Sequence, residues 1–358
     1  MKEGTEMDDD WRVRWNIGVL GLLSVVAVSF GFGQHEASTR AEEVQIQNGG
    51  VVLSGTITMP TTQGPHPAIM LIHGSIPADR TDPFFQTFVK LFSKSGLAVL
   101  FYDKRGAGKS TGNHNASTLA DFAGDAVAGV NFLRKRKDID PKRIGVWGIS
   151  QGGWLSFVVA SKVPDLAFII SVSGPAVTPG EQMIYFRGNE LRQKGLPEEE
   201  VTLVSNFRRD LWSYFRTNSG YDNVRKQFAQ LKSGGLQEKA GWPPAGVEVP
   251  KPEEIDSVSF GWFKGDMGFD PVPYYASVRC PVLAVFGEKD ILIPVQKTID
   301  IMKAELGKRK VDFTSKVFPG ANHVIQIAES GKEMGQSPFA SGYLGHMENW
   351  LLKRFGEK

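Results

Sequence analysis

Ser150 lies at the centre of residues 148–152 (Gly-Ile-Ser-Gln-Gly), between an apolar run at 143–147 and a helix-like stretch at 154–162. A serine on a strand-to-helix turn, with a glycine two positions away on each side, is the pattern of a nucleophile elbow. The turn is too tight for side chains at the flanking positions. The helix that follows directs its free N–H groups and its positive dipole end at the serine. The pattern predicts that Ser150 acts as a nucleophile.

The same five-residue pattern occurs a second time, around Ser110 at 108–112. Because 40 of the 358 residues are glycine, the pattern alone is weak evidence. Ser110 follows the strand-like run at 97–102 only after several loop residues, and the next helical pattern begins near Thr118. The strand–turn–helix setting is therefore missing, and we expect Ser110 to be an ordinary loop residue.

A serine hydroxyl needs a base within hydrogen-bond reach, and the base needs an acid that fixes its tautomer. Of the six histidines, His323 lies just beyond the last predicted strand, where catalytic groups gather in α/β sheets. The others are His35 after an export-like segment, His66 before a strand, His73 after a strand, His114 near Ser110, and His346 in the last helix. His323 is the predicted base.

The acid is also expected after a strand, between the serine and the histidine in the chain. Asp290 follows the apolar run at 282–286 and is the predicted acid, with Glu288 as the alternative. The order serine, aspartate, histidine is that of α/β-hydrolases and differs from the chymotrypsin and subtilisin orders.

Acyl transfer also needs N–H donors for the developing oxyanion. The backbone N–H of Gln151, which follows the nucleophile, is one candidate, and that of Gly74 or Ser75 is the second. No histidine or carboxylate cluster has metal-ligand spacing, and the segment 106–110 lacks the first glycine of a phosphate loop. The sequence therefore predicts neither a metal nor a cofactor.

Strand-like and helix-like segments alternate from residue 44 onward. The strands are expected at 51–59, 68–72, 97–102, 143–147, 166–172, 282–286 and 311–318, and helices at 84–92, 119–133, 154–162, 295–306 and 342–355. Thr118 and Asp121 are placed as a capping pair for the second helix. The segment 51–59 alternates like an edge strand. This order predicts an α/β fold with a mostly parallel, twisted sheet flanked by helices.

The alternation breaks between residues 174 and 270, after the strand expected at 166–172. Helix-like pieces at 181–194, 198–215 and 222–232 precede a proline- and glycine-rich passage, and aromatic residues recur. The aromatic residues are Tyr185, Phe207, Trp212, Tyr214, Phe215, Trp262 and Phe263. They fit either the core of a helical subdomain or a cap that shapes an apolar pocket, and both readings can hold. We expect a helical cap at 174–270 inserted into a core of residues 41–173 and 271–358.

Residues 1–40 have the features of an export segment. An uncharged stretch at 17–32 follows Arg12 and Arg14, which fits a signal peptide or an uncleaved membrane anchor, with a buried cytosolic helix as the third alternative. We expect an exported protein, periplasmic or extracellular, or one anchored to the membrane through 17–32.

The charge and the cysteine count of the chain exclude some classes of partner and of covalent cross-link. The formal net charge is +2 and no basic cluster is present, so nucleic-acid binding has no support. The single cysteine, Cys280, excludes an intramolecular disulfide and is expected to be a small core residue. The sequence leaves the oligomeric state open.

Several motifs, linked in one order over residues 44–358, resemble the α/β-hydrolase superfamily. The chain is most similar to bacterial, often exported, esterases related to the dienelactone hydrolases and to acylaminoacyl-type peptidases. The motifs are His73-Gly74-Ser75, Pro77 with Asp79-Arg80, Tyr102-Asp103-Lys104-Arg105-Gly106 with Gly108 and Ser110, and the segments 140–145, 148–152 and 286–290. Residues 102–106 are expected to form a charged, structurally paired turn near the site. The chain departs from that branch at Ile76, where the branch commonly has glycine. A β-branched residue disfavours a positive φ. We therefore expect the oxyanion loop or the acyl pocket to have a different shape here.

Together these features predict a serine hydrolase that cleaves small carboxylic esters through an acyl-enzyme. Two alternatives stay open. One is an exported amide or peptide hydrolase with the same triad, because the triad serves both chemistries. The other is a non-catalytic ligand-binding protein on the hydrolase scaffold.

Overall fold

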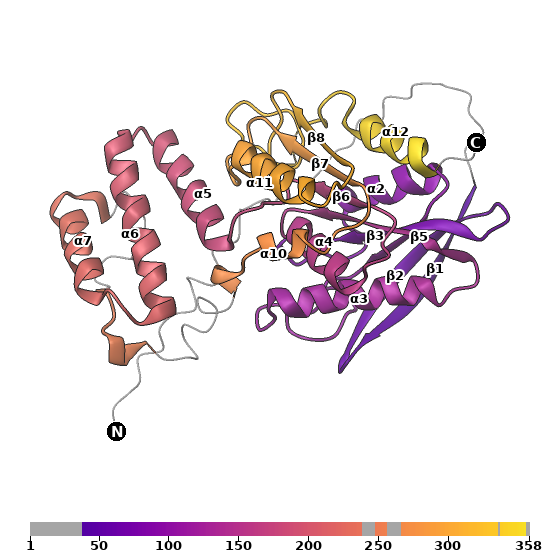
Figure 1. The fold of residues 1–358 in the computed structure, drawn as a ribbon, viewed down its shortest axis with the longest axis horizontal. Helices are drawn as coiled ribbons and strands as arrows, with labels where there is room; N and C mark the ends of the chain where they lie inside the picture. The colour runs from indigo at the N-terminus through magenta and orange to yellow at the C-terminus, as the bar shows by residue number, and fades with distance from the viewer. Residues whose placement is uncertain (1–37, 238–247, 256–265, 336, 356–358) are drawn as a thin grey trace.

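The computed structural model describes residues 38–237, 248–255, 266–335 and 337–355 (Figure 1). Within these residues, eight strands form one sheet in the order β1-β2-β4-β3-β5-β6-β7-β8. The strands are β1 (Thr39–Asn48), β2 (Val51–Pro60), β3 (His66–Ile72), β4 (Ala98–Tyr102), β5 (Ile139–Ile149), β6 (Ile169–Val172), β7 (Val282–Gly287) and β8 (Phe313–Phe318). Strands β3 to β8 run parallel, and β2 is antiparallel to β1 and to β4. The predicted mostly parallel α/β sheet is confirmed.

The predicted position of residues 51–59 at the sheet edge is wrong. This segment is β2, which pairs with β1 on one side and with β4 on the other. Its alternation has a different cause: Ile57 and Met59 are buried, whereas Thr56 and Thr58 on the opposite face are only half-buried. An alternating pattern indicates that one face of a strand is less covered. It does not indicate whether the strand lies at the edge or in the middle of the sheet. The edge strand is β1, which begins at Thr39, so the predicted boundary at residue 40 falls inside it.

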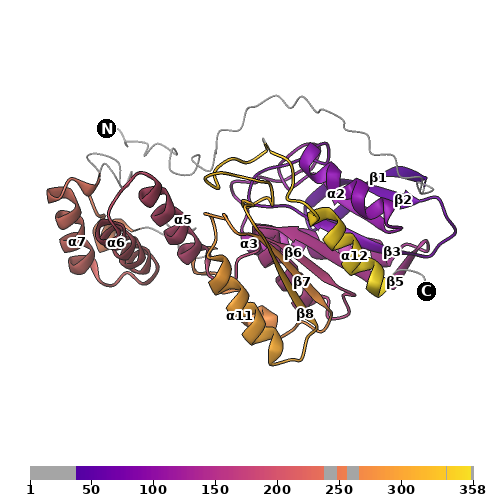
Figure 2. The ribbon, with the colours of Figure 1, turned by 90° about the horizontal axis from the view of Figure 1, so that it is seen from above.

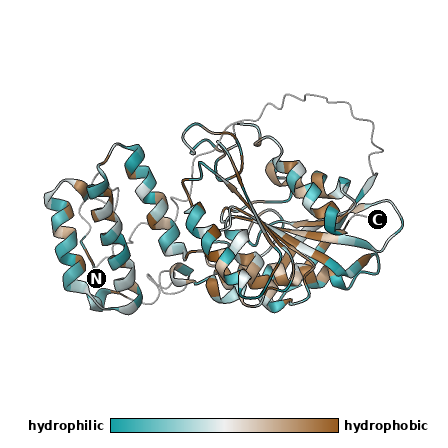
Figure 3. Ribbon diagram, turned by 45° about the horizontal axis from the view of Figure 1, so that its top comes forward, coloured by the Kyte–Doolittle hydropathy of each residue, from teal (hydrophilic) through white to brown (hydrophobic). Residues whose placement is uncertain are grey.

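Two layers of helices cover the sheet. One face carries α2 (Pro83–Lys94) and α12 (Tyr343–Phe355), and the other carries α3 (Leu119–Arg134), α4 (Gln151–Lys162), the short α10 (Val272–Tyr275) and α11 (Val295–Gly307). Figure 2 shows the layers from above. Figure 3 shows strands that are largely hydrophobic between helices with hydrophilic outer faces.

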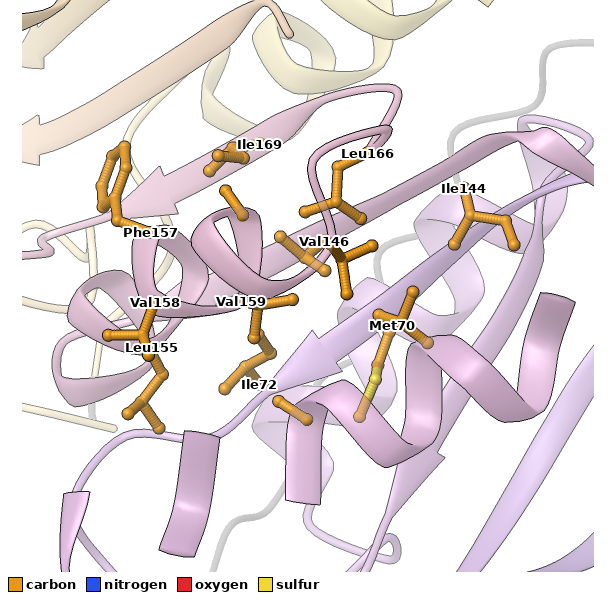
Figure 4. Packing of buried hydrophobic residues seen from close by; sticks show 14 of the residues in the cluster. Met70, Ile72, Ile144, Val146, Leu155, Phe157, Val158, Val159, Leu166 and Ile169 are labelled. Carbon is orange, nitrogen blue, oxygen red and sulfur yellow. The ribbon is translucent and has the colours of Figure 1, made fainter. Parts of the chain in front are cut away.

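Strand β3 shows how the core is divided. Ile69 and Leu71 pack on the α2 and α12 side, whereas Met70 and Ile72 pack on the α3 and α4 side. Successive side chains of a strand point to opposite faces, so a strand covered on both sides reads as a continuous apolar run. Figure 4 shows Met70 and Ile72 with Val146 among the side chains of α4. Helix α3 begins with the predicted capping box of Thr118 and Asp121.

In the described residues, three long helices follow β6 before the short α10 and β7. They are α5 (Pro179–Gln193), α6 (Glu198–Thr217) and α7 (Tyr221–Ser233), followed by the single turns η1 (Pro252–Glu254) and η2 (Asp266–Gly268). Figures 1 and 2 both show this helical unit beside the sheet domain. It has an apolar core of its own, which includes Phe207, Tyr214 and Phe215. These aromatic side chains are therefore core residues of the unit, and its role as a cap stays a prediction; Trp262 and Phe263 lie outside the described residues.

The leader predicted at residues 1–40 lies almost entirely outside the described residues, including Arg12, Arg14 and the stretch 17–32. In the part of the chain that the structure describes, no helix has both the length and the apolar character needed to cross a membrane.

The predicted charged turn after β4 is held by paired side chains. Arg105 binds Asp125 of α3 through two hydrogen bonds, of 2.9 Å from Nε and 2.7 Å from the terminal nitrogen, and Asn48 of β1 donates to the same carboxylate at 2.7 Å. Asp103 accepts hydrogen bonds from the backbone N–H groups of Arg80, at 2.8 Å, and Lys109, at 2.7 Å. The turn is thus fixed to the sheet edge and to α3.

We expect Asp125→Ala to lower the free energy of unfolding by about 3–5 kcal/mol, because it leaves the largely buried Arg105 guanidinium without its main partner. Lys308→Ala is the control: Lys308 pairs with Glu305 on the surface, and losing that pair should cost less than about 1 kcal/mol. Urea denaturation of both variants measures the difference. Equal losses would contradict the structural role of Asp125.

Candidate active site

Ser150 occupies the sharp turn between β5 and α4, with φ 54° and ψ −116°. A residue with a side chain rarely adopts this conformation, which costs about 1–3 kcal/mol and persists only where the surrounding structure enforces it. The backbone N–H of Ser150 donates to the carbonyl of Val172 at 2.9 Å, and its carbonyl accepts from Gly153 at 2.8 Å. These bonds hold the serine between β6 and the first turn of α4.

The two glycines of the elbow are required by close backbone packing. A Cβ on Gly148 would overlap the carbonyl of Gly152, and a Cβ on Gly152 would lie 2.8 Å from the carbonyl oxygen of His73 and overlap that of Ile72. The start of α4 therefore lies directly against the end of β3. This contact brings the loop after β3 to Ser150.

His323 and Asp290 form a buried pair. Nδ1 of His323 lies 2.7 Å from Oδ2 of Asp290, and both side chains are almost fully buried. The other carboxylate oxygen, Oδ1, accepts the backbone N–H groups of Leu292 at 2.9 Å and Ile293 at 3.3 Å. With these bonds Asp290 is fixed in its loop and presents one oxygen to the imidazole. Glu288, the alternative acid, is exposed and accepts instead from the backbone N–H of Gly320 at 2.8 Å.

The second ring nitrogen of His323, Nε2, is buried and has no hydrogen-bond partner among the described residues. The loop that carries it is shaped by Asn322, whose Oδ1 accepts the backbone N–H groups of Val324 and Gln326, each at 3.0 Å. Ile325 in the same turn has φ 60°, which is unusual for a β-branched residue. Asn322 was not predicted as a site residue, although it directly precedes the candidate base.

The loops of the acid and the histidine meet at Gly287, the last residue of β7. A Cβ there would lie 2.7 Å from the carbonyl carbon of Ala321 and would overlap the carbonyl oxygen of Asn322. The backbone N–H of Lys289 also donates to the Ala321 carbonyl at 2.7 Å. The absence of a side chain at Gly287 allows the two loops to approach closely enough for the pair to form.

The candidate oxyanion donors lie next to Ser150. A Cβ built on Gly74 would lie 3.7 Å from Cβ of Ser150, and Gln151 is the first residue of α4, where a backbone N–H has no partner within the helix. Among the described residues, the N–H groups of Gly74 and Ser75 donate no hydrogen bond. Ile76 does not adopt a positive φ, and its side chain is 54% exposed. Its effect on the acyl pocket stays a prediction.

The other histidines have different surroundings. The ring of His73 is buried against Phe101 and Tyr102, and burial lowers its pKa well below the usual value. Burial also lowers the pKa of His114 to about 4, with a contribution from the charge of Lys104. His66 bonds the carbonyl of Thr62 at 3.0 Å. His346 lies on α12 beside Phe318, and His35 is outside the described residues.

Ser110 is confirmed as a loop residue. Its Oγ donates to the carbonyl of Asp103 at 2.6 Å and accepts the N–H of Ser54 at 2.9 Å, so it joins the charged turn to β2. Cys280 is a buried residue, as predicted, and burial raises the pKa of its thiol to about 12. Across the described ranges, no group of three or more histidine, cysteine or carboxylate side chains is placed to hold a metal ion.

Helix α5 contacts both loops that carry the buried pair. Nδ2 of Asn189 donates to the carbonyl of Ile291, next to the candidate acid, and Nε2 of Gln193 donates to the carbonyl of Ser330, each at 2.9 Å. The helical unit is therefore bonded directly to the loops after β7 and β8. No sequence pattern indicated these contacts.

Two family models match the chain. Residues 49–232, just over half of the chain, match the X-Pro dipeptidyl-peptidase (S15) family, and residues 263–337 match the dienelactone hydrolase family.

Several individual proteins are similar to this chain at 24–29% sequence identity. The esterase EstD of Thermotoga maritima is 24% identical over 316 residues, which cover 84% of this chain and 66% of that protein. The thiohydrolase aneE of Aspergillus aculeatus is 29% identical over 78% of this chain and 86% of its own length. An uncharacterised 31.7 kDa protein of Escherichia coli is 25% identical over 68% of this chain and 79% of its own length.

Solved structures share the fold. Est1E of Butyrivibrio proteoclasticus, solved with ferulic acid, has a TM-score of 0.55 at 16% identity and covers 88% of this chain and 100% of its own. The Pyrococcus furiosus esterase Pf2001 has a TM-score of 0.53 at 19% identity, covering 92% and 96%.

We expect Gly287→Ala to lower the free energy of unfolding by about 1–3 kcal/mol, because the new methyl group must push apart the backbones of two packed loops. Gly345→Ala is the matched control, since a Cβ at this position of α12 meets nothing within 4 Å and alanine favours a helix by about 1 kcal/mol. Chemical denaturation of both variants measures the effects. Equal stability of the two variants would contradict the close approach at Gly287.

Proposed function

Because the chain belongs to the X-Pro dipeptidyl-peptidase (S15) family and is a hydrolase of the α/β-hydrolase type, we propose that it cleaves carboxylic esters with Ser150, His323 and Asp290. Ser150 is the proposed nucleophile, His323 the base and Asp290 the residue that orients the base. The substrate is a small-molecule ester, and an acyl-enzyme is the intermediate.

One observation carries this proposal: a buried imidazole whose Nδ1 is engaged by a carboxylate and whose Nε2 has no partner among the described residues. The 2.7 Å bond to Asp290 favours the tautomer with the proton on Nδ1, which leaves the lone pair of Nε2 free to accept a proton. A strained serine at the end of β5 supports the same reading, because strain of this kind gathers at functional sites.

In the proposed reaction, Oγ of Ser150 attacks the ester carbonyl carbon while its proton passes to Nε2 of His323. The negative charge that develops on the carbonyl oxygen is stabilised by the N–H of Gln151 and by the N–H groups of the loop after β3. The tetrahedral intermediate then collapses, the C–O bond to the alcohol breaks, and His323 returns the proton to the leaving oxygen.

The second half of the reaction repeats these roles with water. His323 removes a proton from a water molecule that attacks the acyl carbon, and the bond to Ser150 breaks as the serine regains its proton. Asp290 accepts the hydrogen bond from Nδ1 throughout and stabilises the imidazolium that forms in each half. No further group is needed to balance the steps.

The family match favours a second candidate, hydrolysis of a peptide bond, since X-Pro dipeptidyl-peptidases are named for that reaction. Support for ester cleavage comes from the similarity to EstD, which spans 84% of this chain, and from the match to the dienelactone hydrolase family. The same three residues would serve both reactions, so the distinction depends on the leaving group and the pocket.

We expect a fluorophosphonate probe to label the wild-type protein and not Ser150→Ala, whose turnover of p-nitrophenyl esters should fall by about 10⁴- to 10⁶-fold. Ser110→Ala is the matched control. It alters the other copy of the pentapeptide, removes only the loop hydrogen bonds of Ser110, and should label at the wild-type rate. Labelling that survives Ser150→Ala would place the nucleophile elsewhere, and a folded wild-type protein that is not labelled would overturn the hydrolase mechanism.

A substrate panel separates the two candidate reactions. We expect kcat/KM for p-nitrophenyl esters of two to eight acyl carbons to exceed that for aminoacyl- and Xaa-Pro-p-nitroanilides by at least about 100-fold, which corresponds to about 2.7 kcal/mol of transition-state stabilisation. The same panel reports the acyl-length preference of the pocket. Faster cleavage of the Xaa-Pro-anilides would favour the peptidase instead.

A further inference from the structure

Lys104 is a buried cation in the charged turn after β4. Its side chain is 2% exposed, and its Nζ donates to the carbonyl of Gly74 at 2.6 Å, to the carbonyl of Ser75 at 3.1 Å and to Oε1 of Gln151 at 3.0 Å. An ammonium group has three protons, so these three acceptors engage all of them. The same nitrogen lies 4.4 Å from the centre of the Phe122 ring. All three acceptors belong to residues whose backbones were assigned to the oxyanion site.

Burying this charge is costly, and an ion pair does not offset the cost. Within the described residues, no carboxylate oxygen lies within 4.0 Å of Nζ. The carboxylate of Asp125, whose charge acts on Lys104, is bonded to Arg105. Burial lowers the pKa of Lys104 to about 7, with Asp125 opposing the shift, so the three-proton ammonium form predominates below that pH. His73 and His114 face the same charge, which lowers their pKa values further. An apolar residue would fill such a place at lower cost. Stability therefore does not explain why a lysine occupies this position.

The geometry of the two peptide units that Lys104 contacts indicates a role for the lysine. In a trans peptide, the C=O and the N–H of one plane point in opposite directions. The carbonyl of Gly74 shares its plane with the N–H of Ser75, and the carbonyl of Ser75 shares its plane with the N–H of Ile76. Because both carbonyls point at Lys104, both N–H groups are directed away from it. The loop lies against Ser150, with Gly74 as its nearest residue.

A cation that donates to a carbonyl oxygen also strengthens the N–H of the same peptide as a donor, because hydrogen bonds polarise one another along a chain. The bond to Oε1 of Gln151 holds the side chain of the residue whose own N–H is the other oxyanion donor. One ammonium group thus contacts both halves of the candidate oxyanion hole from behind. It touches no reacting atom itself.

We propose that Lys104 is a positioning residue, which orients and polarises the N–H groups of the 74–76 loop toward the oxyanion and couples that loop to Gln151. The inference rests on the proposed serine hydrolase function. It assigns to the charged turn after β4 a role in lowering the transition-state energy, beyond its role in holding the turn in place.

Lys104→Met tests the inference, with Lys109→Met as the matched control, because Lys109 is an exposed lysine of the same turn. Orientation of donors matters only when the oxyanion develops, so kcat for p-nitrophenyl acetate should fall by about 10- to 100-fold in Lys104→Met while KM changes less than about threefold. Lys109→Met should match the wild type in both. A fluorophosphonate should still label Lys104→Met to completion, more slowly, because Ser150 and His323 are intact. A merely structural lysine would lower Tm and leave kcat unchanged, which would overturn the inference.

A second variant keeps the test decisive if Lys104→Met does not fold. Gln151→Ala removes one acceptor of the ammonium and keeps the backbone N–H of residue 151; kcat should fall by about three- to tenfold with unchanged KM. Where Lys104→Met does fold, adding Gln151→Ala to it should have no further effect, because contacting residues in one network are non-additive. Wild-type kcat in Gln151→Ala, or full additivity in the double variant, would contradict the coupling.

The proposed function and this inference fail in different ways. If the wild-type protein neither hydrolyses the ester nor reacts with the probe, the serine hydrolase mechanism is wrong. If the wild type does both and Lys104→Met turns over at the wild-type rate, only the role of Lys104 is wrong.

Discussion

The strained conformation of Ser150 is the constraint on which the rest of the site depends. A side chain at φ 54° and ψ −116° is held there by β5 on one side and α4 on the other, with β3 and β6 packed against the turn. Only glycine fits at residues 148 and 152, because the backbones approach without room for a Cβ. The same close packing brings the loop after β3 to the serine and aims the first turn of α4 at it. The positions of the proposed nucleophile, the proposed oxyanion donors and the N-terminus of α4 thus all follow from one tight turn.

A second close approach assembles the other half of the site. Strands β7 and β8 are neighbours in the parallel sheet, so the loops that follow them emerge at the same edge as Ser150. Gly287 lets these loops touch, and Asp290 then reaches His323. Helix α5 bonds to both loops through Asn189 and Gln193, so the helical unit and the buried pair share a boundary. A displacement of that unit would therefore act on the loops that carry the proposed acid and base.

Much of this arrangement could be predicted from the sequence, for local reasons. The buried strands are short apolar runs, and the elbow, the capping box of Thr118 and Asp121, and the loop residue Ser110 each have a recognisable local pattern. The prediction that β2 is an edge strand was wrong because an alternating pattern indicates burial alone. Strand β2 alternates because one of its faces is less covered, and no local pattern indicates that β1 pairs beside it. The contacts of Lys104 depend on residues 29 to 47 positions away, which no local periodicity encodes. The same holds for the bonds from Asn189 and Gln193.

The position of a covalent adduct tests directly whether Ser150 is the activated nucleophile that we propose. After reaction of the wild-type protein with diethyl p-nitrophenyl phosphate, tryptic digestion and mass spectrometry would locate the phosphoryl group. We expect one diethylphosphoryl group per chain, on the peptide of residues 144–162 and on Ser150 within it. An adduct on the peptide of residues 110–134, which contains Ser110, or no adduct on a folded protein, would contradict it.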